Sequence, residues 1–367
     1  MREGWEYICF ESCLNKIPKA KQVKTKEYNS GTKYPIISQE DKLISGYCDD
    51  ESMLFHIDKP VIIFGDHTRV LKYIDFDFVV GADGVKIISP KENLNAKFLL
   101  YFLTWYNIPN LGYSRHYKLL KELDIPVPPL STQLSIVSEL DKINELIRLK
   151  KEQLKDYDNL AQSIFYEMFG DPVVNEKGWD FKKIGEIGTV ERGAGISKKD
   201  FVEDGLPCIH YGQLHTILGP TTRHHHSCIP ESLLPKYKIA HTNDIIMAIT
   251  SEDVEGSCKS TAWLGNYDIV IGSDAAILHH EQDGTFLSYY TMTKAFFNEK
   301  SKYAKGFKVT HISAKEIENI PVYLPPLALQ KDFAKRIEVI EHQKENIKST
   351  IQDLETLLAS RMQYWFD

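Results

Sequence analysis

The sequence predicts an α+β protein in which two similar domains form a pseudo-twofold tandem repeat, separated by long antiparallel coiled-coil helices. Three observations predict this arrangement: an internal repeat, a proline boundary in each copy and a heptad pattern after each boundary. We expect the first domain at residues 1–125, the first helical spacer at 126–170, the second domain at 171–320 and the second spacer at 321–367.

The repeat is clearest at the proline boundaries. Residues 121–133 read KELDIPVPPLSTQ, and residues 315–330 read KEIENIPVYLPPLALQ. Both segments predict a short helix, an extended Ile-Pro-Val strand, a Pro-Pro-Leu stop and the start of a new helix. Proline interrupts helix interiors and strand ladders and favours extended geometry in the residue before it. Each Pro-Pro pair therefore predicts a boundary.

Upstream of each boundary the two copies match more loosely. Gly4-Trp5 recurs as Gly178-Trp179, and VVGADGVKI at 79–87 recurs as VIGSDAAIL at 270–278. Apolar, β-branched runs at 61–64 and 245–249 predict strands, and we expect a helix at 95–106 and another at 286–297. Strands and helices together make each domain α+β.

A heptad pattern follows each boundary. Apolar residues recur at alternating steps of three and four, which predicts a coiled-coil seam between two helices. Lys150, Lys344 and Arg361 fall on the same seams and could help to set the register. Two unrelated surface helices would not share such flanks. The apolar seam residues are Ile136, Leu140, Ile143, Ile147, Leu154 and Ile164 in the first helix and Phe333, Ile337, Ile340, Ile347, Ile351, Leu354 and Leu358 in the second.

Composition limits the class of protein. The 367 residues carry a net charge of −7, which does not exclude nucleic acid because binding depends on where the charge lies. No apolar run is long enough for a membrane helix, and no apolar stretch follows the charges at the start. The six cysteines include no CxxC pair. We expect a reduced, cytoplasmic protein with no membrane partner.

Enzymatic motifs are missing from the sequence. There is no Asn/Asp-Pro-Pro-aromatic motif for methyl transfer to an amine, no glycine-rich cofactor loop and no GxSxG or HExxH. Asp83 and Lys86 resemble a nuclease pair, but the second copy has Asp274 without the lysine. A tight turn explains both aspartates better. We expect no catalytic residue in this chain.

Taken together, the doubled Ile-Pro-Val and Pro-Pro-Leu segments, each followed by a heptad helix, resemble the specificity subunits of type I restriction–modification systems. The likeness covers essentially the whole chain, including LGYSRHYKLL at 111–120 and SIFYEMFG at 163–170. We expect no additional helix before the first domain, although some members of the family carry one.

The resemblance implies that each domain is a target-recognition domain reading one half of a split double-stranded DNA site. It implies that the helices dock two modification (methyltransferase) subunits, and that restriction (motor-nuclease) subunits join for cleavage. S-adenosylmethionine, ATP and Mg²⁺ would belong to those partners, and this chain would hold no cofactor. The alternative is a coiled-coil interaction scaffold without specific DNA binding.

Basic side chains in the first domain are candidates for DNA contact. Only Glu27 opposes a run of lysines whose Pro18 and Gly31 predict a loop, which suits phosphate contact or is simply solvated. Arg69, in a turn after an apolar strand, could bond guanine or form a structural ion pair. The resemblance places the turn with Arg115 and His116 near DNA. The lysines are Lys16, Lys19, Lys21, Lys24, Lys26 and Lys33.

The second domain offers a comparable set. Arg192, Lys198 and Lys199 lie in a glycine-rich loop without P-loop spacing, so we expect contacts to the DNA backbone. His210 and Gln213 could meet base edges or close a buried strand end. Arg223 precedes three histidines and Cys228, where DNA or solvent contact is a better interpretation than zinc. By the same resemblance, the turn before the second boundary contributes Lys305, Lys308 and His311.

Overall fold

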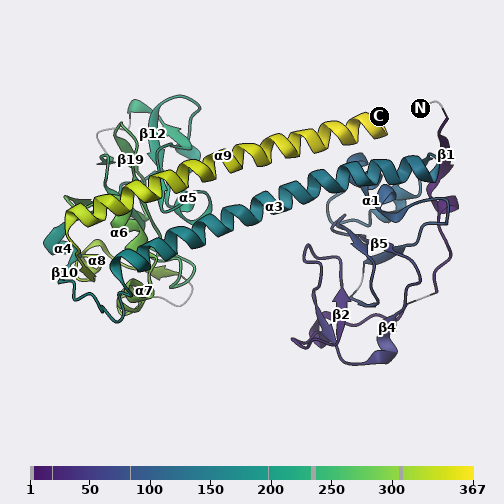
Figure 1. The fold of residues 1–367 in the computed structure, drawn as a ribbon, viewed down its shortest axis with the longest axis horizontal. Helices are drawn as coiled ribbons and strands as arrows, with labels where there is room; N and C mark the ends of the chain where they lie inside the picture. The colour runs from purple at the N-terminus through teal and green to yellow at the C-terminus, as the bar shows by residue number, and fades with distance from the viewer. Residues whose placement is uncertain (1–3, 19, 83, 197, 233–236, 306–308) are drawn as a thin grey trace. The chain divides into compact units, whose positions relative to one another are not determined.

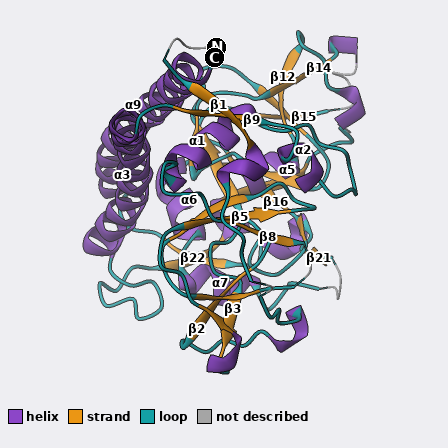
Figure 2. Ribbon diagram, turned by 90° about the vertical axis from the view of Figure 1, so that its right-hand side faces the viewer, coloured by secondary structure: helices purple, strands orange, loops and turns teal. Residues whose placement is uncertain are grey.

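The computed structural model describes residues 4–18, 20–82, 84–196, 198–232, 237–305 and 309–367. The chain folds into two compact units, Met1–Glu152 with Lys348–Asp367, and Gln153–Ile347. Each unit combines sheets, short helices and parts of two long helices (Figure 1, Figure 2). Within the described ranges, no helix has the length and apolarity needed to cross a membrane.

The first domain is built on two small sheets. One has the order β3-β2-β7-β4, with β2 parallel to β7, and the other has β5 between β6 and β8. A separate antiparallel pair joins β1 to β9. The elements are β1 Glu6–Cys9, β2 Tyr34–Ile37, β3 Gly46–Cys48, β4 Leu54–Phe55, β5 Val61–Gly65, β6 Leu71–Ile74, β7 Phe78–Val80, β8 Val85–Ile88, α1 Ala96–Tyr106, α2 Tyr117–Leu120 and β9 Asp124–Val127, with 3-10 turns at Phe10–Cys13, Thr25–Glu27 and Glu51–Met53.

Helix α1 forms because its ends are capped and one face is apolar. The Asn95 side chain accepts a hydrogen bond from the Phe98 amide at 3.1 Å, and the chain leaves the helix at Asn107 with a φ of +45°. The apolar face packs into the domain core together with Phe366, whose ring centroid lies 5.5 Å from that of Phe98. The last turn of the chain therefore completes the core of the first domain.

The second domain has larger sheets. Their orders are β11-β20-β16-β18-β13 and β14-β12-β19-β15, and the two-stranded pairs are β10-β22 and β17-β21. The strands are β10 Phe181–Lys183, β11 Gly188–Arg192, β12 Leu206–Ile209, β13 Thr221–Thr222, β14 Ser227–Ile229, β15 Lys238–Ala240, β16 Ile245–Ala248, β17 Thr250–Ser251, β18 Ser260–Trp263, β19 Ile269–Ile271, β20 Ala275–His280, β21 Thr310–His311 and β22 Pro321–Tyr323. The short helices are α4 Ile184–Ile187, α5 Tyr211–Thr216, α6 Gly284–Thr291, α7 Lys294–Lys300 and α8 Ala314–Ile317, with a 3-10 turn at Lys198–Asp200.

The single helix expected at 286–297 was a wrong prediction. The structure has two helices, α6 and α7, separated at Met292 and Thr293. The Thr293 hydroxyl accepts a hydrogen bond from the Phe296 amide at 3.3 Å and so starts a new helix. A capping threonine competes with continuation of the first helix. The apolar pattern of the sequence did not reveal this break.

The two domains repeat the same strand pairings, which confirms the predicted tandem repeat. The parallel pair β2–β7 recurs as β12–β19, β5–β8 recurs as β16–β20, and β1–β9 recurs as β10–β22. The two Ile-Pro-Val triplets, however, are not equivalent. Pro126 pairs with Tyr7, two residues after Trp5, whereas Tyr323 pairs with Phe181, two residues after Trp179. Pro126 therefore corresponds to Tyr323, and the two-residue shift keeps the same faces inward.

Two 40-residue helices, α3 Leu130–Phe169 and α9 Leu327–Phe366, follow the proline boundaries. Glu139 pairs with Arg361 and Lys151 with Glu355 in the first unit, and Asp158 pairs with Lys344 in the second. In these pairs the residue number on α3 increases while the residue number on α9 decreases. The two helices are therefore antiparallel, as predicted. Nine of the thirteen predicted seam residues are buried, whereas Leu154, Ile164, Leu354 and Leu358 are half-buried and Phe165 is more buried than its neighbour Ile164.

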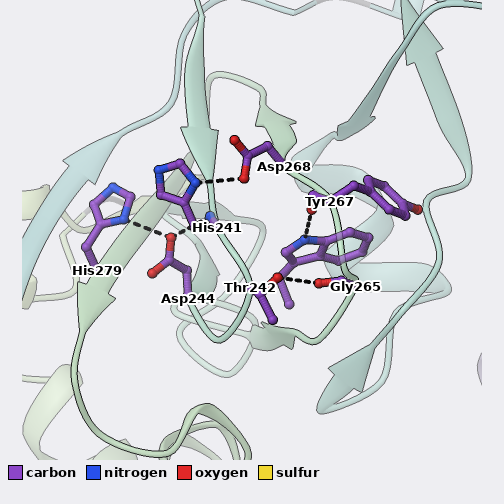
Figure 3. A network of polar contacts seen from close by, with 8 residues as sticks. His241, Thr242, Asp244, Gly265, Tyr267, Asp268 and His279 are labelled. Atoms are coloured by element: carbon purple, nitrogen blue, oxygen red, sulfur yellow. Dashed lines mark hydrogen bonds and ion pairs between the residues drawn. The ribbon is translucent and has the colours of Figure 1, made fainter.

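A polar network holds the turn between β15 and β16 (Figure 3). One Asp244 carboxylate oxygen lies 2.7 Å from the His241 amide and 2.8 Å from His279 Nδ1. The His241 ring in turn lies 2.8 Å from Asp268. This network is at the start of β16, whereas the candidate interface described below is at the other end of that strand.

Candidate nucleic-acid interface

Loops from several strands meet at one end of the first domain. The His67 amide donates to the Gln39 side chain at 3.2 Å, and the Thr68 hydroxyl donates to the Gln39 carbonyl at 2.6 Å. The Asp66 amide donates to the Gly84 carbonyl at 2.7 Å. The ends of β2 and β5 and the β7–β8 turn are thus tied together.

His116 connects this end to the loop before α2. Its Nδ1 lies 2.9 Å from the Asp66 carbonyl, and its Nε2 accepts from the Leu111 amide at 2.9 Å. The residue is 0% exposed. The prediction that His116 contacts DNA is therefore wrong, because both ring nitrogens are occupied inside the domain. Arg115, next to it, is exposed.

The lysine segment is a loop, interrupted by one 3-10 turn at Thr25–Glu27. It is tied to the same end of the sheet, because Gln22 bridges to Val80 and the Tyr28 hydroxyl accepts from the Ala82 amide at 2.9 Å. Lys19 lies outside the described residues. The exposed members are Lys16, Lys21, Lys24, Lys26 and Lys33.

Arg69 has a structural contact. It has a φ of +64°, and its Nη1 donates to the Ile108 carbonyl at 2.9 Å. The residue is half-buried. The guanidinium thus ties the β5–β6 turn to the segment after α1, through a backbone carbonyl instead of the carboxylate that an ion pair would use.

The equivalent end of the second domain gathers several predicted residues. Arg192 Nη2 lies 3.6 Å from Asp274, whose carboxylate accepts from the Thr250 hydroxyl at 3.3 Å. The same hydroxyl is 3.2 Å from His311 Nδ1. Lys305 forms a backbone bridge with His311, and its ammonium lies 2.5 Å from Glu316. Lys308 lies outside the described residues.

The two basic loops occupy the same place in the repeat. Ala194 forms a parallel bridge with Gly272 at the end of β19, as Gln22 does with Val80 at the end of β7. A Cβ on Gly193 would lie 2.2 Å from the Gly272 carbonyl oxygen, so the close approach of these loops requires glycine. Lys198 and Lys199 are exposed on the loop that follows.

His210 and Gln213 cap α5. His210 Nδ1 accepts from the Gly212 amide at 3.1 Å, and the Gln213 side chain accepts from the His210 amide at 2.8 Å while donating to Ser227 at 3.1 Å. Burial, followed by the charge of Lys198, lowers the pKa of His210. His210 is 8% exposed, so the alternative of a buried strand end holds, and the predicted base contacts for this pair are corrected.

Arg223 belongs to a different surface. Its guanidinium lies 2.7 Å from Glu338 on α9, which ties the loop after β13 to that helix. The neighbouring His225 contacts the Tyr267 hydroxyl at 2.7 Å. Across the described ranges, no three His, Cys, Asp or Glu side chains are placed to hold a metal ion.

Sequence reasoning missed three side chains at these ends. Tyr113 is fully exposed and its ring lies parallel to that of His67. Lys259 donates to the His215 carbonyl at 3.0 Å, and His215 Nε2 lies 3.1 Å from the Thr250 carbonyl. Tyr113 could have been found from the Gly-aromatic-basic pattern of its turn. His215 ends the polar segment that begins at His210, which could have marked it, whereas Lys259 carried no signal, because only the fold brings it to His215.

Comparisons with known proteins agree with this architecture. The family described as "Type I restriction modification DNA specificity domain" matches residues 2–156 and 176–356. The chain is 24% identical over 274 residues to the MjaVIII specificity subunit of Methanocaldococcus jannaschii, covering 66% of this chain and 63% of that relative. It is 28% identical over 206 residues to the EcoR124I/EcoR124II specificity subunit of Escherichia coli, covering 50% of this chain and 48% of that relative. These matches span less than two thirds of either relative.

Two solved structures share the fold. A crystal structure of a type I restriction–modification S subunit from M. genitalium aligns with a TM-score of 0.59 and 15% identity, covering 99% of this chain and 96% of that one. A chain from a structural study of type I complex assembly and conformational transition aligns with a TM-score of 0.56 and 17% identity, covering 100% and 98%. With two matched regions that together span most of its length, this chain belongs to the type I restriction modification DNA specificity family.

Proposed function

We propose that this chain reads a two-part sequence in double-stranded DNA and directs partner subunits to it, itself acting as a recognition subunit without catalytic residues. The observation that carries the proposal is the duplicated end of the two domains, where a basic loop joins the ends of the same strands in each copy. Two similar but unequal readers suit two different half-sites.

Within this proposal the exposed lysines neutralise phosphates. Such contacts position a protein on DNA and make its affinity depend on salt. Arg115 and His311 are the proposed base-edge contacts, because they are exposed beside the strand ends, and exposed Arg192 is a proposed contact to the DNA backbone. His116, His210 and Gln213 hold those loops in place. The proposed phosphate contacts are Lys16, Lys21, Lys24, Lys26, Lys33, Lys198, Lys199 and Lys305.

The proposed partners follow from family membership. Two modification subunits would dock on α3 and α9, and restriction subunits would join that complex. S-adenosylmethionine, ATP and Mg²⁺ would be bound by those partners, with none held by this chain. A coiled-coil scaffold without specific DNA binding is the second candidate, favoured only by the length of the paired helices.

The test is to co-express the chain with a modification subunit of its system and to map methylated adenines in the host DNA. A split motif with a fixed gap is expected, and exchanging residues 171–320 for those of a relative should change one half only. An intact complex that methylates nothing would favour the scaffold. A contiguous motif would contradict reading by two separate domains.

The lysine loop gives a sharper measurement. Replacing Lys21, Lys24, Lys26 and Lys33 by Gln should weaken binding to all DNA sequences. The slope of log affinity against log salt should fall by about 1 for each phosphate that is no longer neutralised. A variant with Gln at exposed Lys59 and Lys91, which lie before β5 and after β8 at the end of that sheet away from the loop, provides the control. Equal slopes in both variants would remove the loop from the interface.

A further inference from the structure

Among the large hydrophobic side chains of the described residues, Tyr113 is the most exposed, and it lies at the proposed DNA-facing end of the first domain. Its relative exposure is 100%. Its ring nevertheless lies parallel to that of His67, with centroids 5.6 Å apart and an interplanar angle of 17°. Aromatic rings usually bury much of their large area, so a fully exposed ring held against a second ring points to a contact outside the domain.

The His67 ring that lies against Tyr113 is itself packed against other residues of the domain. Gly84 also lies against the His67 ring: its φ is +93°, and a Cβ there would stand 3.0 Å from His67 Cδ2 and 2.7 Å from Gln39 Oε1. His67 Nδ1 has no hydrogen-bond partner among the described residues, so packing positions this ring. The β7–β8 turn therefore supports His67, and His67 supports Tyr113.

The loop that carries Tyr113 is anchored on both sides. Before it, Leu111 donates its amide to His116 and Gly112 donates its amide to Asn110 at 2.9 Å. After it, the His116 amide donates to the Asp66 carbonyl at 2.8 Å. Between these anchors Tyr113 and Arg115 are exposed, so the loop presents an aromatic ring and a cation close together.

We propose that Tyr113 is the aromatic DNA contact of the first domain and that its ring stacks on a nucleobase, with Arg115 as the adjacent polar contact. The inference rests on the proposed function and assigns an aromatic base contact to one half-site. In a duplex the faces of each base are covered by its neighbours, so the Tyr113 ring would stack as a wedge at a base step that is partly unstacked. The second copy repeats the Gly-aromatic pair as Gly306-Phe307, which lies outside the described residues.

Three variants separate stacking from other roles. Tyr113→Ala removes the ring, Tyr113→Phe keeps it, and Tyr106→Ala removes a tyrosine of the same domain that is 46% exposed. The probe is the duplex carrying the motif found by methylation mapping. With the complete complex, Tyr113→Ala should raise the Kd for this duplex about tenfold, as expected for loss of one stacked base. Tyr113→Phe and Tyr106→Ala should stay within about twofold.

Two further readouts follow the same complexes. The slope of log affinity against log salt should not change in Tyr113→Ala, because the substitution leaves the phosphate contacts in place. When 2-aminopurine replaces one base at a time in the half-site of the first domain, one position should change fluorescence on binding. That change should disappear in Tyr113→Ala and persist in Tyr106→Ala.

The outcomes distinguish this inference from the proposed function. Specific binding by the wild-type complex that is unaltered in Tyr113→Ala overturns the stacking assignment alone. Absence of any specific binding by the wild-type complex overturns the proposed function as well. If Tyr113→Ala dissociates the modification subunit while the fold is intact by thermal melting, Tyr113 is a protein contact and the DNA assignment is wrong.

Discussion

At the scale of single residues, charged and titratable groups inside the fold stabilise the folded state or make it sensitive to pH. Lys344 is 7% exposed on the helix seam, and its ammonium lies 2.7 Å from Asp158 and 2.8 Å from Glu341. Burial opposes its charge, but the two carboxylates outweigh burial and raise the pKa of Lys344. This lysine satisfies the sequence expectation of a basic residue on the seam.

Lys344→Ala should lower the free energy of unfolding by about 2 kcal/mol, since it removes a buried stem and leaves two carboxylates without their cation. Lys344→Met keeps the apolar stem but leaves the same two carboxylates without their cation, so it should lose less stability than Lys344→Ala and more than the exposed control. Urea denaturation of both variants checks this, with exposed Lys348→Ala as control. A Met variant as unstable as the Ala variant would mean that the ion pair itself stabilises the seam.

His280 should make the second domain sensitive to acid. Burial lowers its pKa to about 4 from 6.5, although nearby backbone groups of Gln282 and Asn243 act in the opposite direction. Both ring nitrogens are buried, and neither has a hydrogen bond of ordinary geometry in the described part of the chain. The unfolded chain therefore binds a proton that the folded chain does not, between about pH 6.5 and pH 4. His280 therefore leaves the free energy of unfolding unchanged above pH 6.5 and lowers it as the pH drops, by up to about 3 kcal/mol.

The check is the unfolding free energy from pH 7.5 to pH 4.5 for wild type and His280→Phe. The variant should lose less stability over this range, and His224→Phe, at an exposed histidine, should follow the wild type. Parallel curves for all three proteins would show that His280 is already charged in the folded state at low pH.

At the scale of elements, a buried glutamine joins each long helix to its domain. Gln133 donates to the Pro128 carbonyl at 2.7 Å and accepts from the Asn95 amide at 2.7 Å. Gln330 repeats this with the Pro325 carbonyl at 2.8 Å and the Asp283 amide at 3.0 Å. Asn95 and Asp283 are the N-caps of α1 and α6, so each glutamine links the first turn of a long helix to the start of a domain helix.

Gln133→Ala and Gln330→Ala should each cost about 2–4 kcal/mol, because each leaves a buried amide and a buried carbonyl without partners. Hydrogen exchange should show reduced protection in the first unit for Gln133→Ala and in the second for Gln330→Ala. Exposed Gln162→Ala on α3 is the matched control. If either variant lowers hydrogen-exchange protection equally in both units, the two glutamines do not stabilise separate cores.

At the scale of the whole molecule, segments distant in sequence share cores. Phe366 contacts Phe98, Phe102 and Trp105 with ring centroids 5.5–5.9 Å apart, so the end of α9 belongs to the first unit. In the second unit, Phe165 and Phe169 near the end of α3 contact Phe286 and Phe333. Each long helix therefore begins at one domain and ends in the core of the other unit.

Phe366→Ala should destabilise the first unit by about 3 kcal/mol, through reduced aromatic burial and a cavity, and leave the second unit unchanged. Region-resolved hydrogen exchange or limited proteolysis would report the effect in α1, more than 250 positions away along the chain. Gln363→Ala, at an exposed site one turn earlier, is the control. Unchanged protection of α1 would show that the last turn is not part of that core.

By itself, the sequence determined the tandem repeat, the start of a long helix after each Pro-Pro pair and the antiparallel helices, because proline geometry and heptad spacing act locally and occur twice. It also placed the basic loops, since charge and glycine content mark exposed segments. Only the tertiary structure decided which polar residues remain available. His116, His210 and Gln213 have the chemistry of base readers, but folding commits their hydrogen bonds to distant backbone groups and a helix cap. Tyr113, in contrast, stays exposed after folding. The His67 ring that lies against it comes from a strand end, and only the fold brings that strand end alongside.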